Sequence, residues 1–190
     1  MSEQIQQWHQ KIDWLTGEFK ERFCDIPADE LNRKPNADTW SIAENLQHLI
    51  TVNESYFPII EQMKQGKYKP PFLGKISFFV NFMGKTILKS VSPDNRKKIR
   101  TFSMWEPAAA NINGDIVSRF GKHQTVLKDM IASTEEFISK GTVISSPANH
   151  NIVYTLGKAF EIMITHEERH LNHSIEAFEV IYKNQYKYDL

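Results

Sequence analysis

The sequence has one cysteine, no excess of either charge and no long apolar run. The single cysteine, Cys24, excludes an internal disulfide and is typical of a reducing compartment. Because 23 Lys and Arg balance 23 Asp and Glu, the net positive charge that usually accompanies nucleic-acid binding is missing. A membrane span would require roughly 18 consecutive apolar residues. We therefore expect neither nucleic-acid nor membrane partners.

The N-terminal residues, Met1 to Gln4, also lack the basic and apolar regions of a signal peptide, which favours a cytoplasmic location. The length of 190 residues and a hydrophobic content of 41% suit one domain with a sizeable core, spanning residues 1–190. Strand patterns are weak throughout, and residues 142–144 are too few to build a sheet. The oligomeric state stays open, with a homodimer as one candidate assembly.

Helical spacing of apolar residues is the dominant pattern. We predict four principal helices over residues 2–23, from 41 to about 65, 115–139 and 155–181. A further short helix over residues 75–90 is apolar on most sides, which is typical of a deeply packed or a membrane-adjacent helix. We prefer core packing because the run is only about 16 residues long and contains Lys85. Long connectors span residues 25–39, 92–113 and 142–154. These features predict an all-α protein, an up-down-type four-helix bundle with an additional short helix and long connecting loops.

Two helix starts carry capping residues. Ser41 and Glu44 have the spacing of a capping box, in which hydroxyl and carboxylate satisfy free backbone N–H groups reciprocally. Thr155 can cap the last helix, and Gly141 ends the one before it. Glu44 also lies one turn before His48, where it could support the imidazole, although capping alone explains it and is the interpretation we prefer.

Three histidines share one stripe of the last helix. His166 and His170 are one turn apart, and His173 lies within roughly 20° of the stripe. Apolar residues on or near it, such as Phe160, indicate that the imidazoles point inward. The second helix offers His48 beside apolar neighbours. In contrast, the polar flanks of His123 predict an exposed side chain.

Buried imidazoles need partners, and a divalent metal is a common partner for two of them one turn apart. One histidine from the second helix and two from the last would supply three neutral nitrogen ligands. Zn²⁺, Ni²⁺ and Fe²⁺ all accept imidazole, so the residues do not select the metal. Three protein ligands leave a coordination position open, where bound water or a thiol can be activated.

Two motifs carry a family resemblance: residues 40–49, Trp-Ser-Ile-Ala-Glu-Asn-Leu-Gln-His-Leu, and residues 166–171, His-Glu-Glu-Arg-His-Leu. They resemble the two signatures of the DinB-like superfamily of metal-binding four-helix bundles. The resemblance implies that His48, His166 and His170 are the metal ligands. The superfamily is similar in fold to bacterial thiol transferases and a thiol-dependent isomerase, which implies a low-molecular-weight thiol as co-substrate and an electrophilic small molecule as substrate. His173 stands where Gln is frequent, and is a bystander, a supporting donor or an alternative ligand.

Other readings of the same residues stay open. Residues 166–170 match His-Glu-x-x-His, the zincin protease motif, with Glu167 as general base, but the extended metzincin pattern is missing and no sheet edge is predicted to bind a peptide. A metal-dependent hydrolase could use bound water with Glu167 or Glu44 as base. A non-catalytic or stress-related bundle is a further alternative, in which the histidines bind metal for structure or sensing, or are neutral core residues bonded to Glu and Asn side chains. Nucleophilic catalysis by Cys24 is disfavoured because no histidine is positioned beside it.

The connector over residues 92–113 contains Phe102 and Trp105. Loops of this length are often functional, and these aromatic side chains could cover a pocket. Alternatively, they only hold the loop against the bundle.

Overall fold

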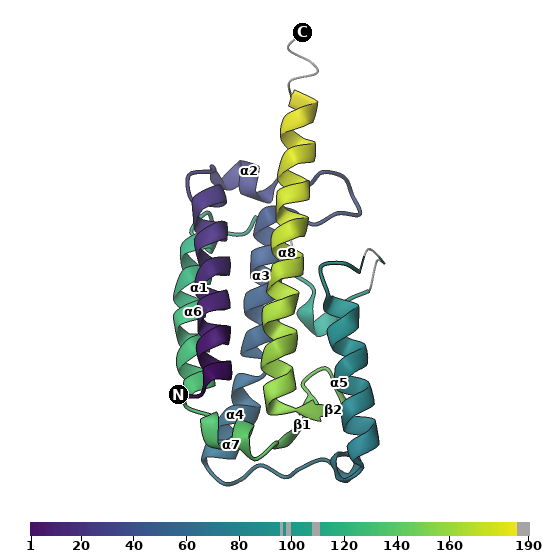
Figure 1. The fold of residues 1–190 in the computed structure, drawn as a ribbon. Helices are drawn as coiled ribbons and strands as arrows, with labels where there is room; N and C mark the ends of the chain where they lie inside the picture. The colour runs from purple at the N-terminus through teal and green to yellow at the C-terminus, as the bar shows by residue number, and fades with distance from the viewer. Residues whose placement is uncertain (96, 98–99, 108–110, 186–190) are drawn as a thin grey trace.

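The computed structural model describes residues 1–95, 97, 100–107 and 111–185, and these residues form a mostly helical fold (Figure 1). The predicted all-α bundle is confirmed. The long helices are α1 (Glu3–Phe23), α3 (Ile42–Glu54), α6 (Ile116–Ala132) and α8 (Leu156–Gln185). The shorter elements are α2 (Ala28–Asn32), α4 (Phe57–Lys64), η1 (Phe72–Lys75), α5 (Ser77–Val91), η2 (Ser103–Trp105), α7 (Glu135–Ser139), β1 (Val143–Ser146) and β2 (Asn149–Thr155).

The four long helices pack side by side. Both α1 and α3 contact α6 and α8, so the four together enclose one core. In Figure 1, α1 and α8 run towards the end where the C-terminus lies, and α3 and α6 run the opposite way. The additional helix α5 lies outside this set, where it contacts α8 and β2.

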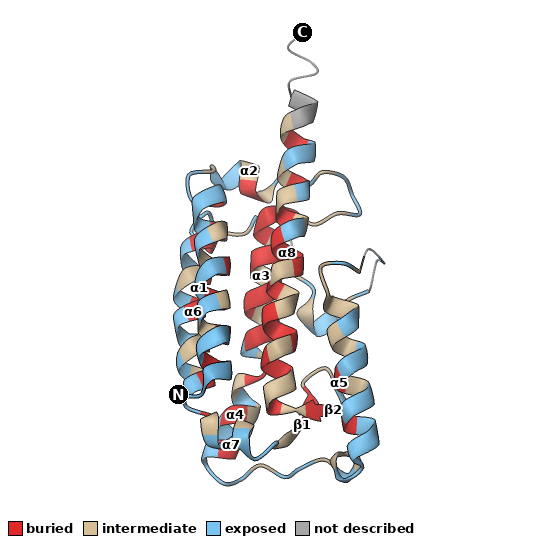
Figure 2. Ribbon diagram, viewed as in Figure 1, coloured by how far each residue is buried: buried red, intermediate tan, exposed pale blue. Residues whose placement is uncertain are grey.

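The apolar stripe of α1 is buried as predicted. It consists of Ile5, Trp8, Ile12, Leu15, Phe19 and Phe23. Phe19 meets Phe120 of α6 edge-on, with ring centroids 4.9 Å apart. Figure 2 shows the same concentration of buried residues along α3 and α8. Each large apolar side chain buried in this way contributes about 1.5–3 kcal/mol to folding.

Both predicted caps are present at the helices that carry the histidines. The Glu44 N–H donates to Ser41 Oγ at 3.1 Å, and the Ser41 N–H donates to Glu44 Oε2 at 2.8 Å. At the start of α8, the Lys158 N–H donates to Thr155 Oγ1 at 3.1 Å. The caps fix where α3 and α8 begin, and therefore which side chains face each other across the core.

The predicted helix over residues 115–139 is interrupted, so that prediction was wrong at its C-terminal end. Helix α6 ends at Ala132, and α7 begins at Glu135. The Thr134 hydroxyl donates to the Ile131 carbonyl oxygen at 2.9 Å, a local side-chain bond that competes with the helical hydrogen bond. Gly141, with a φ of 63°, then follows α7 as predicted.

A two-stranded hairpin lies where we predicted a connector. Strands β1 and β2 pair antiparallel, with Ile144 opposite Tyr154. The expectation that residues 142–144 could form no sheet was wrong. Their partner strand, β2, lies in a segment that we predicted as a connector. The Tyr154 hydroxyl is 2.6 Å from the Tyr56 hydroxyl, which ties the hairpin to the segment before α4.

Helix α5 is not the core helix that we predicted. Val80 and Gly84 are buried, whereas Phe78, Phe79 and Phe82 are exposed. A Cβ at Gly84 would lie 2.9 Å from Lys158 Cγ, so this glycine allows α5 to approach α8 closely. Within the part of the chain that the structure describes, every helix is too short or too polar to span a lipid bilayer.

Candidate metal centre

Three histidine Nε2 atoms converge between α3 and α8. His166 Nε2 lies 2.9 Å from His170 Nε2 and 3.4 Å from His48 Nε2. One ligand nitrogen of each histidine lies within 4.8 Å of the other two. His48 and His170 are buried and His166 is partly buried. The structure thus brings together the three residues that the sequence suggested as metal ligands.

The other ring nitrogen of two of these histidines is held by an oxygen. His48 Nδ1 donates to the Trp105 carbonyl oxygen at 2.7 Å. His170 Nδ1 donates to Asn45 Oδ1 at 2.6 Å, and Asn45 Nδ2 donates to the Ser41 carbonyl oxygen at 2.8 Å, which fixes the amide orientation. A nitrogen that faces an oxygen acceptor carries the proton, so each Nε2 presents its lone pair to the centre.

The surroundings keep all three imidazoles neutral. Burial lowers the pKa of His48 to about 4. Burial also places the pKa of His166 and that of His170 well below 6.5, and the neighbouring imidazoles lower them further. A neutral imidazole has a free lone pair, which metal binding requires.

The nitrogen spacing fits a single divalent cation. With nitrogen–metal distances of about 2.0–2.1 Å, two ligands lie about 3.3 Å apart in tetrahedral geometry and about 2.9 Å apart in octahedral geometry. The two Nε2 separations from His166, 3.4 and 2.9 Å, lie near this range, and the ligand nitrogens of all three residues lie within 4.8 Å of one another. Hydrogen bonds among the three rings alone cannot satisfy the Nε2 atoms. His166 Nε2 has at most one proton to donate, whereas the lone pairs of His48 Nε2 and His170 Nε2 both face it.

Two tryptophans border the centre. The Trp40 ring stacks on His170 at 5.9 Å between centroids and lies 4.8 Å from the His48 ring. Trp105 Nε1 donates to Ser55 Oγ at 3.1 Å, and Phe102 packs edge-on against the Trp105 ring. The aromatic residues of this connector therefore hold it against the bundle, and through the Trp105 carbonyl they also reach the centre.

His173 lies beside the three converging histidines. Its ring meets the His170 ring edge-on, with centroids 5.3 Å apart. It lines an open pocket of about 800 Å³ together with Asp94, Asn172 and Glu176. Burial lowers the pKa of His173. His173 is therefore the residue through which this pocket adjoins the centre, since the three converging histidines are not among its lining residues.

Arg169 anchors the loop that borders this pocket. Its Nη1 donates to the Ser92 carbonyl oxygen and its Nη2 to the Lys97 carbonyl oxygen, both at 3.0 Å. Nη1 also contacts the Asn95 carbonyl oxygen. Because guanidinium donors are rigid and planar, these bonds fix the loop along α8.

Glu167 occupies a different side of α8. Its Oε1 accepts from Asn53 Nδ2 and its Oε2 from Gln124 Nε2, each at 2.8 Å. The side chain is fully buried, and burial raises its pKa to about 7. Both carboxylate oxygens are therefore held by amides of α3 and α6.

His123 belongs to the same polar group, so the prediction that it is exposed was wrong. Asn53 Nδ2 lies 3.2 Å from His123 Nε2, and the His123 ring stacks on Phe57 at 5.8 Å. Burial lowers the pKa of His123 to about 4. The polar neighbours that suggested exposure in the sequence include Gln124, which is itself buried.

Glu44 sits in the capping box at the start of α3, and its Oε1 also accepts from Lys34 Nζ at 3.1 Å. Sequence reasoning did not assign roles to Asn45, Arg169 or the Trp105 carbonyl. Asn45 is three residues before His48, a spacing that could have indicated a shared helix face. No signal could have identified the Trp105 carbonyl, because every residue has one.

One comparison with known proteins identifies a family. A family model described as the DinB superfamily matches residues 11–174, a range that includes all three converging histidines. No curated protein and no solved structure matches the chain.

Proposed function

The chain belongs to the DinB superfamily, and from this premise we propose that it binds one divalent metal ion through His48, His166 and His170 and activates a low-molecular-weight thiol. The activated thiol is transferred to an electrophilic small molecule. The observation that supports the proposal is the convergence of three neutral imidazole nitrogens at spacings of 2.9 and 3.4 Å. Zn²⁺, Ni²⁺ and Fe²⁺ all suit these ligands.

A metal held by three neutral ligands keeps its full positive charge, so it stabilises a thiolate at an open position. The chain contributes orientation and shielding. Asn45 and the Trp105 carbonyl hold two imidazoles in the ligand tautomer. Trp40 covers one side of the rings and limits the access of water. The pocket beside His173 offers polar partners for the substrate.

The positions of possible nucleophiles and bases favour an external thiol. The single cysteine, Cys24, is exposed at the C-terminal cap of α1, outside the set of residues that surround the histidines. A hydrolase would need a carboxylate base near bound water. The oxygens of Glu167 are engaged by Asn53 and Gln124, and those of Glu44 by its own cap and Lys34. The hydrolase alternative therefore has less support than the transferase.

The test compares two substrate panels on metal-loaded protein prepared without a nickel column. One panel pairs electrophiles with bacillithiol, glutathione or related thiols, and the other contains esters and amides without thiol. We expect thiol conjugation above the uncatalysed rate in the wild type and in His150→Ala, a control at an exposed histidine of β2, and none in His48→Ala.

Two results would contradict the transferase proposal. Thiol-independent hydrolysis that disappears in His48→Ala, with no conjugation, would establish the hydrolase instead. Stoichiometric metal with neither activity would favour the non-catalytic bundle.

A further inference from the structure

Large apolar side chains are exposed at one end of α5. We refer to Phe72, Ile76, Phe78, Phe79 and Phe82 as the aromatic tip. Phe72 is 77% exposed, Phe78 71% and Phe82 58%. The rings of Phe78 and Phe82 stack on each other with an interplanar angle of 9°, and Phe79 meets Phe78 edge-on. Phe78, Phe79 and Phe82 thus form one apolar cluster, and Phe72 of η1 and Ile76 precede it in the chain. Figure 2 shows the lower part of α5 as largely exposed.

Such a surface is unusual in a protein whose core is otherwise well formed. Single exposed apolar side chains are normal, but contiguous apolar patches mark interaction sites. The aromatic tip is also not needed to attach α5 to the bundle. That attachment comes from Val80 and Gly84, on the side of α5 that faces β2 and α8.

The stretch of sequence that carries the aromatic tip has charge of one sign, and Glu61, which pairs with Lys64, lies just before it. From residue 62 to residue 93 the chain contains no Asp or Glu and six lysines: Lys64, Lys67, Lys69, Lys75, Lys85 and Lys89. All six are exposed. This contrasts with the zero net charge of the whole chain. Lys75 Nζ lies 5.6 Å from the centre of the Phe72 ring, so charge and aromatic surface are directly adjacent.

We propose that the aromatic tip and these lysines bind the surface of an anionic lipid membrane. Exposed Phe side chains enter the boundary between headgroups and acyl chains, while neighbouring lysines contact the anionic headgroups. A second copy of the chain fits this surface less well, because a symmetric contact would bring lysines against lysines. The proposal goes beyond the metal-dependent function and does not depend on it.

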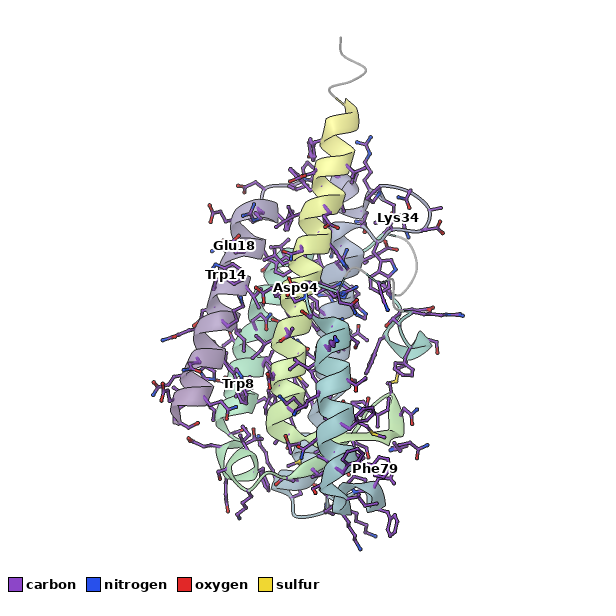
Figure 3. The ribbon with its side chains drawn as sticks, turned by 45° about the vertical axis from the view of Figure 1, so that its right-hand side comes forward. Trp8, Trp14, Glu18, Lys34, Phe79 and Asp94 are labelled. Carbon is purple, nitrogen blue, oxygen red and sulfur yellow. The ribbon has the colours of Figure 1, made fainter. Side chains whose placement is uncertain are left out.

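Surface attachment needs no membrane-spanning helix, so it agrees with the helix lengths and polarity described above. The sequence-based expectation of no membrane partner set aside a membrane-adjacent position of residues 75–90 in favour of core packing, and the exposure of Phe78 and Phe82 removes that reason. Figure 3 shows Phe79 at one end of α5 and Asp94, a residue of the pocket beside His173, near the other. At 1.5 Å per residue these ends are about 20 Å apart. An attached molecule would therefore leave the pocket accessible.

The test is flotation of the full chain with vesicles made of equal parts phosphatidylcholine and phosphatidylglycerol, beside vesicles of phosphatidylcholine alone. The wild type should float with the anionic vesicles only, and high salt should release it. Replacing both Phe78 and Phe82 by Ser should lower the partition coefficient roughly tenfold or more. Replacing both Lys75 and Lys85 by Gln should have an effect of similar size.

Matched controls lie on other helices. Val126→Ser removes an exposed apolar side chain of α6, and Lys122→Gln removes an exposed lysine of the same helix. Both should bind like the wild type. Failure of the wild type to float with anionic vesicles would overturn the proposal. It would also be overturned by a wild-type dimer in light scattering that the Phe78 and Phe82 replacements convert to monomer, which would identify a second copy as the partner. Metal content should be unchanged in every variant, which separates this proposal from the metal-dependent function.

Discussion

Buried polar side chains on two sides of α8 differ in their hydrogen-bond partners. His166 and Glu167 are neighbours in sequence, yet the helix turns them about 100° apart. His166 joins His48 and His170, and the lone pairs of His48 Nε2 and His170 Nε2 both face His166 Nε2, which has at most one proton to donate. Glu167 joins Asn53 and Gln124, and two amide donors satisfy its two oxygens. The first group calls for a cation. In the second group the carboxylate has a donor for each oxygen, while the amide oxygens of Asn53 and Gln124 are buried without a hydrogen-bond partner.

The comparison shows that a short motif does not assign a role to each of its residues. His-Glu-x-x-His in a zincin uses its Glu as a base beside the metal. Here the same spacing gives two candidate ligands on one side of α8 and a carboxyl held in the bundle on another. What decides the role is which helix lies opposite each side chain. Variants on the two sides should therefore fail in different ways, one in metal binding and the other in folding.

The largest effect should follow from His170→Ala. Removing one of three ligands should abolish stoichiometric metal binding, measured by elemental analysis, while the helical circular dichroism spectrum is retained because Ala is a good helix former. The exposed control His150→Ala should bind metal like the wild type. Undiminished metal in His170→Ala would show that the three histidines are not the ligands.

The opposite side of α8 is tested by Glu167→Ala. The change leaves the amide donors of Asn53 and Gln124 buried without their acceptor, so the free energy of unfolding should fall by about 2–5 kcal/mol. Metal content should be unchanged. Urea denaturation gives the stability, with Glu168→Ala as the control. Glu168 pairs with Lys11 at the surface, and its loss should cost no more than about 1 kcal/mol. A stable Glu167→Ala protein that retains metal but loses activity would instead favour a catalytic base.

Acidification should lower the stability of the folded protein through His123, which belongs to the same polar group as Glu167. Burial lowers its pKa in the folded state to about 4, from 6.5. Below pH 6.5 the unfolded chain binds a proton that the folded protein does not, so stability falls as the pH drops from about 6.5 to about 4. This contribution reaches at most about 3 kcal/mol. The Glu54 carboxylate lies 3.8 Å from His123 Nδ1, but it is largely exposed and stabilises a protonated His123 only weakly.

The measurement compares the urea midpoint of wild type and His123→Gln at pH 7 and pH 4.5. The wild type should lose more stability on acidification than the variant, because Gln does not titrate. Equal losses in the two proteins would show that His123 is not responsible.

The sequence predicted those parts of the fold that depend on local periodicity and caps. The stripe from Ile5 to Phe23 is buried, and Ser41 and Thr155 cap α3 and α8. Helix spacing also placed His166 and His170 on one face. The pairing of β1 with β2 was missed because a strand four residues long gives little signal without its partner. Apolar content alone did not show that Phe78 and Phe82 lack a facing helix.

The three histidines of the candidate centre could be predicted from the sequence, but the groups that hydrogen-bond to them could not. Histidine spacing and a motif in α3 suggested His48, His166 and His170. The bond from His48 to the Trp105 carbonyl joins residues 57 positions apart, and a backbone oxygen has no signature in sequence. The burial of His123 depends on Phe57 and Asn53, which come from other helices. Tertiary partners, rather than local pattern, determine both.

The smallest effect should come from His173→Gln, which tests whether the metal-binding side of α8 extends to residue 173. The His173 ring meets His170 edge-on at 5.3 Å between centroids, and its side chain lines the pocket beside the centre. Within the described residues, the group that can hold a metal consists of His48, His166 and His170. Gln keeps a donor and an acceptor but lacks an imidazole, so metal content should be unchanged. If the pocket binds the thiol or its acceptor, the KM should change a few-fold, by roughly the value of one hydrogen bond, with a smaller change in kcat. Metal loss as complete as in His170→Ala would instead make His173 a ligand and extend the centre by one helical turn.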